Sequence, residues 1–319
     1  MWYIIDNRGS DDPAVNLAIE QYVLRCKRLD DHYILVCRNR PAVVIGKHQN
    51  VAEEVNLKYC AEKKIPLFRR LSGGGAVYHD PGNINFSFIT RRSLKKVNNF
   101  SYFIEPLLRL IRRLGAEARL DARGNIIVNG LKISGNAQFT SRTHMISHGT
   151  LLYETNLHRL RRSLQVNTHS KIVSKSRKSV PDRVGNLIEI LQGNLHITSF
   201  IQKAIEVYQA VPFSLSDTDW RDIEQLAEDK YRSKQWNFDR SPGSKIYCPL
   251  KKVSGKAEII LTLEQGHIVS VDYSQILEKS REAVEARKTL LGIRFDYPVL
   301  KHNRTSWLSE QGWPDILFE

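Results

Sequence analysis

The sequence contains little cysteine and no long apolar run. Its four cysteines, Cys26, Cys37, Cys60 and Cys248, lie far apart and form no C-x-x-C pair. This spacing argues against a zinc site or a disulfide framework and favours a reducing compartment. No apolar run approaches the length of a membrane span. The first residues lack the features of a signal or transit peptide. We therefore expect a soluble, cytoplasmic protein.

Acidic residues are also scarce relative to basic ones. The chain has 34 Asp and Glu against 48 Lys and Arg, a formal net charge of +14. Such an excess suits nucleic acid, an acidic protein or an anionic substrate as partner, and it also suits a merely solvated basic surface. A chain of 319 residues has ample length for a buried core, in one large or two ordinary domains.

The most informative segment covers residues 69–88. Arg69 and Arg70 precede the triplet Gly73-Gly74-Gly75 and a short Ala-Val-Tyr run, which predicts a strand, a glycine-rich turn and a second strand. Glycines let backbone N–H groups approach an anion closely, and arginines add donors for phosphate or carboxylate. The alternative is a tight hairpin with a solvated arginine pair. The spacing matches neither G-x-x-x-x-G-K-[ST] nor G-x-G-x-x-G, so neither of those folds is implied.

The N-terminal region predicts helices and strands around this segment. Asp12-Pro13, followed by apolar residues at helical spacing, predicts a capped helix over residues 12–24. The β-rich runs 33–37 and 42–45 predict a hairpin, and residues 46–50 a polar turn. A helix is expected over residues 55–64, before Pro66.

Lys132 follows Asn129-Gly130, a dipeptide with a strong hairpin bias, so we expect a hairpin within residues 123–137. A lysine at this place is either a solvated edge charge or a cation directed at a phosphate site, and the local sequence leaves both open. A strand is expected at 148–153. Residues 155–181 contain no acidic residue, and the Ser-, Thr- and Lys-rich second half predicts a mobile loop, either a lid or a solvated segment.

The C-terminal part shows a change of pattern. Helices are expected over residues 100–114, 198–208 and 217–234, and residues 239–244 form a turn-rich linker. A hairpin with a Gln265-Gly266 turn and a helix over 275–291 then follow. This predicts a main domain at residues 1–240 and a small α+β accessory domain at 241–319.

Taken together and in order, these motifs resemble the lipoate–protein ligase A family of the biotin/lipoate ligase superfamily. The match covers nearly the whole chain. Besides residues 69–83 it includes Asp12-Pro13-x-x-Asn16-Leu17-Ala18-x-Glu20, Val43-Val44-Ile45-Gly46-x-x-Gln49-Asn50, Lys132-Ile133-Ser134-Gly135-x-Ala137, His148-Gly149-Thr150-Leu151-Leu152, Ser179-Val180-x-x-Arg183-Val184-x-Asn186-Leu187 and Trp236-Asn237-Phe238-x-Arg240-Ser241-Pro242. Each motif alone is weak evidence, but the ordered set is highly specific.

The resemblance implies an α+β catalytic domain with mixed sheets flanked by helices, plus the accessory domain. It implies an enzyme that uses ATP and Mg²⁺ to convert lipoate to lipoyl-AMP. The lipoyl group then passes to a lysine of an apo carrier, either an E2 lipoyl domain of a 2-oxoacid dehydrogenase or the glycine-cleavage H protein. Neither nucleic acid nor a membrane is an implied partner, and a monomer is the default.

The resemblance also implies the site. Lys132 maps onto the family's invariant lysine and is the implied catalytic residue. The implied ATP and lipoyl-AMP site comprises Arg70, Ser72, Gly73, Gly74, Gly75, Ala76, Val77, Tyr78, His79, Asp80, Asn83, Lys132, Ser134, Gly135, His148, Gly149 and Thr150. The candidates for the lipoate pocket are Leu17, Val43, Val44, Gly75, Val77, Lys132 and Gly135. A fixed cation and backbone dipoles would bring the substrate carboxylate and the phosphate together despite their repulsion.

Three residues depart from the family pattern. Asn125 stands where an acidic side chain is usual, so adenylation is in question if that carboxylate positions Mg²⁺ or Lys132. Cys37 replaces a usual Trp, and Asp239 a usual Gly. The runner-up function is therefore an acyltransferase of the same fold that uses preformed lipoyl-AMP or an octanoyl donor.

Other classes fit less well. A cysteine-dependent octanoyltransferase lacks its cysteine here, and a biotin ligase lacks its Gly-Arg-Gly-Arg loop. A nucleic-acid-binding protein would interleave aromatic with basic residues.

Overall fold

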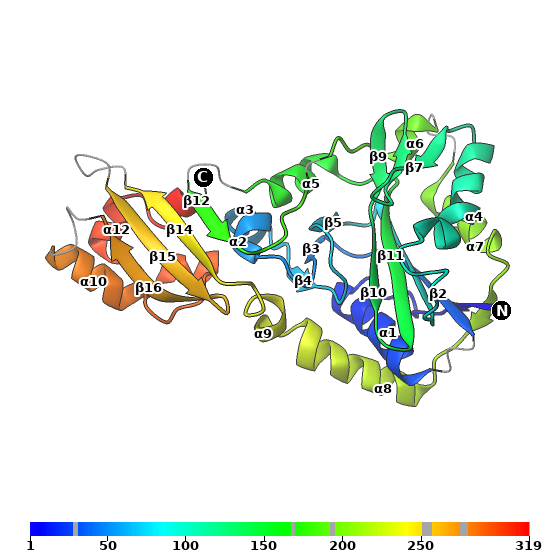
Figure 1. Cartoon of the computed structure of the whole chain (residues 1–319), viewed down its shortest axis with the longest axis horizontal. Helices are drawn as coiled ribbons and strands as arrows, with labels where there is room; N and C mark the ends of the chain where they lie inside the picture. The colour runs from blue at the N-terminus through cyan, green and yellow to red at the C-terminus, as the bar shows by residue number, and fades with distance from the viewer. Residues whose placement is uncertain are drawn as a thin grey trace.

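The computed structural model describes residues 1–27, 31–166, 170–180, 182–191, 195–250, 257–274 and 280–318. Figure 1 shows a larger part built on a six-stranded sheet and a smaller part built on a four-stranded sheet, with α9 (Lys234–Asn237) between them. The expected α+β class with mixed sheets is confirmed. Within the described ranges, no helix is both long and apolar enough to cross a membrane.

The six-stranded sheet has the order β10-β11-β6-β2-β1-β13. Neighbouring strands are antiparallel from β10 to β2 and parallel from β2 to β13. The strands are β1 (Trp2–Ile5), β2 (His32–Cys37), β6 (Asn83–Arg91), β10 (Asn136–Thr140), β11 (His144–Leu152) and β13 (Val211–Phe213). The strand predicted at 148–153 is the second half of β11.

Helices cover both faces of this sheet. Because side chains alternate along a strand, Tyr33 and Leu35 of β2 pack with α1, α8 and η1, whereas Ile34 packs with α4, α6 and α7. The predicted N-terminal cap is confirmed, since the Asp12 carboxylate accepts a hydrogen bond from the Ala14 amide at 2.9 Å. The helices are α1 (Pro13–Cys26), α4 (Phe100–Arg113), α6 (Leu187–Ile190), α7 (Ile197–Glu206), α8 (Asp217–Leu226) and the π-helix η1 (Ala227–Tyr231).

A three-stranded sheet of order β4-β3-β5 carries the glycine-rich segment. Its strands are β3 (Ala42–Ile45), β4 (Leu67–Arg69) and β5 (Val77–His79), and the short helices α2 (Val51–Glu54) and α3 (Leu57–Glu62) follow β3. The hairpin predicted from residues 33–37 and 42–45 is wrong. β2 pairs with β1 and β6, while β3 pairs with β4 and β5. The connection between them carries the chain from one sheet to the other.

The alternative of a tight hairpin around the glycines is also wrong. β4 and β5 lie on opposite sides of β3, parallel and antiparallel to it, so the glycine-rich segment crosses the end of β3. Arg69 and Arg70 are buried rather than solvated.

The hairpin that carries Lys132 is confirmed. β8 (Ile126–Val128) and β9 (Leu131–Ser134) are antiparallel, and β7 (Ala118–Leu120) completes a three-stranded sheet. Asn129 and Gly130 have φ values of 50° and 75°. Two consecutive positive φ angles form the turn that this dipeptide favours.

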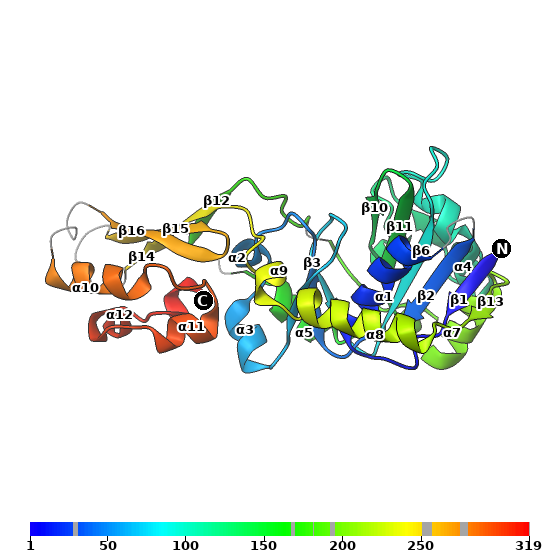
Figure 2. The same cartoon turned by 90° about the horizontal axis from the view of Figure 1, so that it is seen from below.

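The smaller part contains an antiparallel sheet of order β12-β14-β15-β16, with α10, α11 and α12 on one face (Figure 2). The Gln265-Gly266 turn is confirmed between β15 and β16. Helix α10 lies within the predicted 275–291 range, of which residues 275–279 lie outside the described chain. The elements are β14 (Ser244–Pro249), β15 (Glu258–Glu264), β16 (His267–Tyr273), α10 (Arg281–Leu290), α11 (Tyr297–His302), α12 (Ser306–Glu310) and the 3₁₀-helix η2 (Asp315–Leu317).

The loop predicted in the second half of residues 155–181 is wrong in part. Helix α5 (Leu157–Leu164) begins the segment, and β12 (Lys171–Ser174) then forms the edge of the four-stranded sheet by pairing with β14. Partner strands far apart in sequence leave no local signal. The domain boundary between residues 240 and 241 remains a prediction, and β12 lies across it from its partner strand.

Candidate active site

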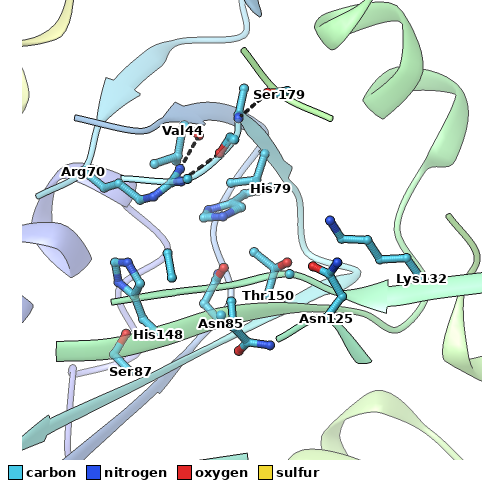
Figure 3. Close-up of a pocket in the computed structure, with 18 of the residues that line it drawn as sticks. Val44, Arg70, His79, Asn85, Ser87, Asn125, Lys132, His148, Thr150 and Ser179 are labelled. Atoms are coloured by element: carbon cyan, nitrogen blue, oxygen red, sulfur yellow. Dashed lines mark hydrogen bonds between the residues drawn. The ribbon is translucent and has the colours of Figure 1, made fainter. Parts of the chain in front are cut away.

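A cavity of about 510 Å³ opens beside the glycine-rich segment. Figure 3 shows Lys132 and Asn125 at one end and His148 and Ser87 towards the other. The structure brings thirteen of the predicted site residues together in its wall: Leu17, Val44, Arg70, Gly74, Gly75, Ala76, Val77, His79, Lys132, Gly135, His148, Gly149 and Thr150.

The other predicted residues lie behind this wall. Val43 and Tyr78 point to the opposite face of their sheet and pack in the core of the smaller part. The remaining five are bonded within the protein: Ser72 and Gly73 to Arg70, Asp80 to the Gly82 and Asn156 amides, Asn83 to Asn85, and Ser134 to Asn136. Any part that these seven play in ligand binding would be indirect.

Arg70 holds the glycine-rich segment in shape. Its guanidinium donates to the carbonyl oxygens of Val44, Gly73 and Gly75 at 2.7–3.1 Å and to Ser72 Oγ at 3.0 Å. Burial lowers the pKa of Arg70 to about 10, which still leaves the group charged at neutral pH. A buried cation behind the loop favours an anion in front of it.

Arg69 has a different role. It is fully buried, and its guanidinium donates to carbonyl oxygens of the chain after β3 and of α9, including Gln49 at 2.7 Å and Asn237 at 2.9 Å. Its donors are occupied by the protein itself. Arg69 was not among the predicted site residues, and these bonds give it a structural role between β4, the chain after β3 and α9.

Lys132 is paired with a carboxylate that the sequence did not suggest. Its Nζ lies 2.9 Å from Asp182 Oδ2, and Arg123 binds the other oxygen of Asp182. Burial alone would raise the pKa of Asp182, but the hydrogen bonds from Arg123 and Lys132 outweigh it and hold the pKa below its ordinary value. Asp182 thus fixes the ammonium group at the entrance of the cavity.

Asn125 is bonded to a second carboxylate. Its Nδ2 donates to Asp121 Oδ2 at 2.8 Å, and its backbone amide donates to Asp121 Oδ1 at 2.8 Å. A carboxylate at this position would have no hydrogen to donate to Asp121. Asn125 therefore has a local structural role as a hydrogen-bond donor.

The inner end of the cavity holds a bonded polar group. His148 Nδ1 lies 3.2 Å from both carboxylate oxygens of Glu20, and its Nε2 lies 2.7 Å from Ser72 Oγ. Ser87 also donates to Glu20. These side chains are buried. The polar atoms of these side chains are thus largely hydrogen-bonded to one another within the cavity wall.

Residues 177–180 and Asp182 line one side of the cavity. Ser179 Oγ accepts from the Ala76 amide at 2.9 Å and donates to Glu54, whose carboxylate also accepts from the Ser179 amide at 2.9 Å. Burial raises the pKa of Glu54. Together these bonds hold the segment against the glycine-rich turn.

Several residues that line the cavity are not among the predicted site residues, above all Glu20, Asn39, Ser179 and Asp182, although Glu20 and Ser179 stand in the motifs quoted above. Two signals were available. Glu20 is an acidic side chain on the buried face of α1, and Asp182 is the first acid after a long segment that has none.

The amino-acid sequence of this chain is similar to those of known proteins. Residues 12–209 match the family model described as the lipoyl protein ligase A/B catalytic domain. The chain is 39% identical to lipoate-protein ligase LplJ of Bacillus subtilis, over 83% of this chain and 82% of the relative.

Solved structures agree in fold. One describes a bi-partite lipoate protein ligase and its E2 lipoyl domain from Thermoplasma acidophilum. It has a TM-score of 0.63 at 23% identity and covers 74% of this chain and 95% of that one. Another, a lipoate-protein ligase A bound with ATP, has a TM-score of 0.60 at 24% identity and covers 74% and 96%.

Proposed function

Because this chain belongs to the lipoate–protein ligase family, we propose that it activates lipoate with ATP and transfers the lipoyl group to a lysine of a carrier protein. The observation that carries the proposal is the difference between the two ends of the cavity. At its buried inner end the polar side chains are bonded to one another, whereas its outer end presents the cations Lys132, Arg123 and Lys178. An acid with an apolar tail and an anionic head fits this arrangement.

The first step joins two anions. The lipoate carboxylate attacks the α-phosphorus of ATP, a C–O–P anhydride forms, and pyrophosphate leaves. Lys132 and the buried charge of Arg70 would offset the repulsion between carboxylate and phosphate. The backbone N–H groups of the glycine-rich segment add dipoles that need no reorientation during the reaction.

The second step needs no protein nucleophile. The neutral ε-amine of the carrier lysine attacks the acyl carbon, the bond to the phosphate oxygen breaks, AMP leaves and the amine loses a proton. Lys132 at the outer end would stabilise the charge on the departing phosphate. The carriers implied by the family are E2 lipoyl domains and H protein, whose acidic surfaces suit a chain of net charge +14.

Mg²⁺ would accompany ATP. Among the described residues no group of three or more acidic, His or Cys side chains forms a ready metal site. Mg²⁺ is commonly held by one or two carboxylates together with substrate phosphates, and Asp182 is the carboxylate that lines the outer end. The residues present therefore fit a phosphate-bound ion rather than one held by the protein alone.

The test is lipoate-dependent exchange of pyrophosphate into ATP. We expect exchange by the wild type and a loss of roughly a hundredfold or more in Lys132→Ala. Lys175→Ala is the control, because Lys175 is an exposed lysine of the same basic segment outside the cavity wall. Absence of exchange, with intact transfer from synthetic lipoyl-AMP to an apo carrier, would refute activation and leave a transferase.

A further inference from the structure

Four basic side chains meet outside the cavity wall, and we call them the cation cluster: Arg25, Lys47, Lys230 and Arg240. They come from α1, the chain after β3, η1 and the chain after α9. Helix α8 runs below α1 in Figure 1 and leads to η1 and α9, and both α1 and α9 pack against η1. Arg25 and Arg240 are exposed, whereas Lys47 and Lys230 are half-buried. The fold thus brings together four cations that are far apart in sequence.

A buried indole ring holds two of these cations near each other. The ammonium nitrogen of Lys230 lies 3.8 Å from the centroid of the Trp236 ring, and the guanidinium carbon of Arg240 lies 4.8 Å from it. Lys230 Nζ also donates to Gln21 Oε1 at 2.6 Å. An aromatic face and an amide oxygen attract cations but carry no full negative charge. These contacts therefore position the two cations without neutralising them.

No carboxylate of the described residues forms an ion pair with a member of the cation cluster. Burial, together with the positive charges of Arg25, Arg240 and Lys47, lowers the pKa of Lys230 to about 8. The fully buried Arg69 adds a further positive charge near Arg240, and its guanidinium is bonded to neutral acceptors. The cluster is thus a concentration of uncompensated positive charge.

A merely solvated basic surface differs from this arrangement. On such a surface long cationic side chains extend into water and keep away from one another, so neither lost hydration nor repulsion affects them much. In the cation cluster both effects act on Lys230, and both disfavour its charged form. Lys230 has hydrogens left to donate after its bond to Gln21. An anion between these side chains would remove the repulsion and accept the remaining donors.

We propose that the cation cluster binds a small oxyanion with two or more negative charges, the class that contains phosphate and pyrophosphate. The compactness of the cluster favours a small anion, because two of its cations lie against one ring. The half-buried position of Lys47 and Lys230 favours an ion that enters between side chains over the surface of a folded protein. The proposal does not depend on the lipoate activity proposed above.

The site has a direct connection to the glycine-rich segment. The backbone amide of Lys47 donates to the carbonyl oxygen of Ser72 at 2.8 Å. The carbonyl oxygen of Lys47 accepts from Arg69 at 3.2 Å. An anion held by the Lys47 side chain would therefore restrain the chain beside the glycine-rich segment.

The first test measures the binding of sulfate to the full-length protein by calorimetry at low ionic strength. Sulfate is a suitable probe because it keeps two negative charges throughout the neutral range. We expect the wild type to bind it and Lys230→Gln and Arg240→Gln to bind it at least about tenfold more weakly, since each loses one unit charge next to a divalent ion. Lys288→Gln is the control, because Lys288 is an exposed lysine of α10 in the smaller part.

Lys132→Ala separates this site from the cavity. We expect its affinity for sulfate to equal that of the wild type, because Lys132 lines the cavity and the cation cluster does not. Equal affinities in the wild type and Lys230→Gln, or no binding by the wild type, would overturn the proposal.

Proton uptake gives a second readout that general screening of charge does not produce. Lys230 has a pKa of about 8, so a bound anion that restores an ordinary value near 10.4 takes up about half a proton at about pH 8. Affinity should consequently fall as the pH rises above about 8. Tyr231, whose ring lies 5.2 Å from Lys230 Nζ, does not contribute, because burial raises its pKa well above this range.

Lys230→Arg is the matched variant for this readout. Arginine keeps the positive charge but does not titrate near pH 8, so we expect sulfate binding to persist and the proton uptake to disappear. The uptake follows from binding enthalpies measured in buffers of different ionisation enthalpy. Binding to the wild type without proton uptake at about pH 8 would overturn the assignment of the site to Lys230.

Competition experiments identify the natural ligand. Phosphate and pyrophosphate are each added to the sulfate complex, and displacement by either supports the proposal, with the tighter competitor naming the form that the site takes. Displacement of sulfate by an apo carrier protein, but by neither phosphate nor pyrophosphate, would overturn it in favour of a protein-docking surface.

Discussion

Asn125→Asp is the substitution that restores the acidic residue expected from the family, and the structure predicts that it is harmful on its own. Asn125 Nδ2 lies 2.8 Å from Asp121 Oδ2. An aspartate in the same position replaces this donor with a carboxylate oxygen, and two carboxylates at that distance do not both ionise freely. The change therefore converts a hydrogen bond into a repulsion.

The magnitude follows from the distance. At 2.8 Å and an effective dielectric constant of about 20, two unit charges repel by about 6 kcal/mol. The variant can avoid this repulsion by keeping one of the two carboxyls protonated. At about pH 7 this costs about 4 kcal/mol for an ordinary pKa near 3.9. We therefore expect a loss in the free energy of unfolding of at most about 4 kcal/mol at neutral pH.

The pH dependence has a definite sign. In the variant, the shared pKa of the two carboxyls is higher in the folded than in the unfolded state, so the folded state binds more protons. The penalty consequently grows as the pH rises above about 4, by up to about 1.4 kcal/mol per pH unit. Urea denaturation of wild type and variant at several pH values between about 4 and 7 measures the difference directly.

A matched control exchanges the two side chains. In Asp121→Asn/Asn125→Asp the amide introduced at position 121 can donate to the carboxylate introduced at position 125, while its own oxygen still accepts from the backbone amides of residues 123 and 125. We expect the double variant to recover most of the stability. A single variant as stable as the wild type at neutral pH, with an unchanged pH profile, would refute the reasoning.

Two further predictions concern the glycine-rich turn and the thiols. A Cβ on Gly46 would lie 2.2 Å from the carbonyl oxygen of Gly74, whereas one on Gly73 would meet nothing within 4 Å. Urea denaturation should therefore show a loss of about 2 kcal/mol or more for Gly46→Ala and within about 0.5 kcal/mol for Gly73→Ala, and equal losses would contradict this. In the native protein iodoacetamide should label exposed Cys26 and spare Cys37, because burial, aided by the charge of Glu20, raises the pKa of the Cys37 thiol. Mass spectrometry of labelled peptides measures both sites, and equal labelling would contradict the explanation.

Local sequence signals were reliable where the cause is local. Asp12 begins α1 because a carboxylate accepts from the first free amides of a helix. The Asn129-Gly130 turn forms because both residues tolerate positive φ. The ordered motifs also brought most of the wall together, including Lys132 and Arg70, since resemblance transfers long-range information that periodicity does not contain.

The wrong predictions share one cause. The sequence of a strand does not determine which other strand it pairs with. The runs at 33–37 and 42–45 were recognised as strands, but their assignment to one hairpin was wrong because each joins a different sheet. β12 has only Ile172 and Val173 as apolar residues, and its partner strand lies far along the chain. The pairing of Asp182 with Lys132 was missed for the same reason.

The segment that contains these missed residues connects the two parts of the molecule at the site. β12 is bonded to the sheet of the smaller part. Next, Ser174 and Ser176 donate to Glu53, and Ser179 bonds to Glu54 and to the glycine-rich turn. Asp182 then binds Lys132. Residues next to β12 in the chain thus line the outer end of the cavity beside Lys132. A lysine held in this way depends on contacts that no single stretch of sequence contains.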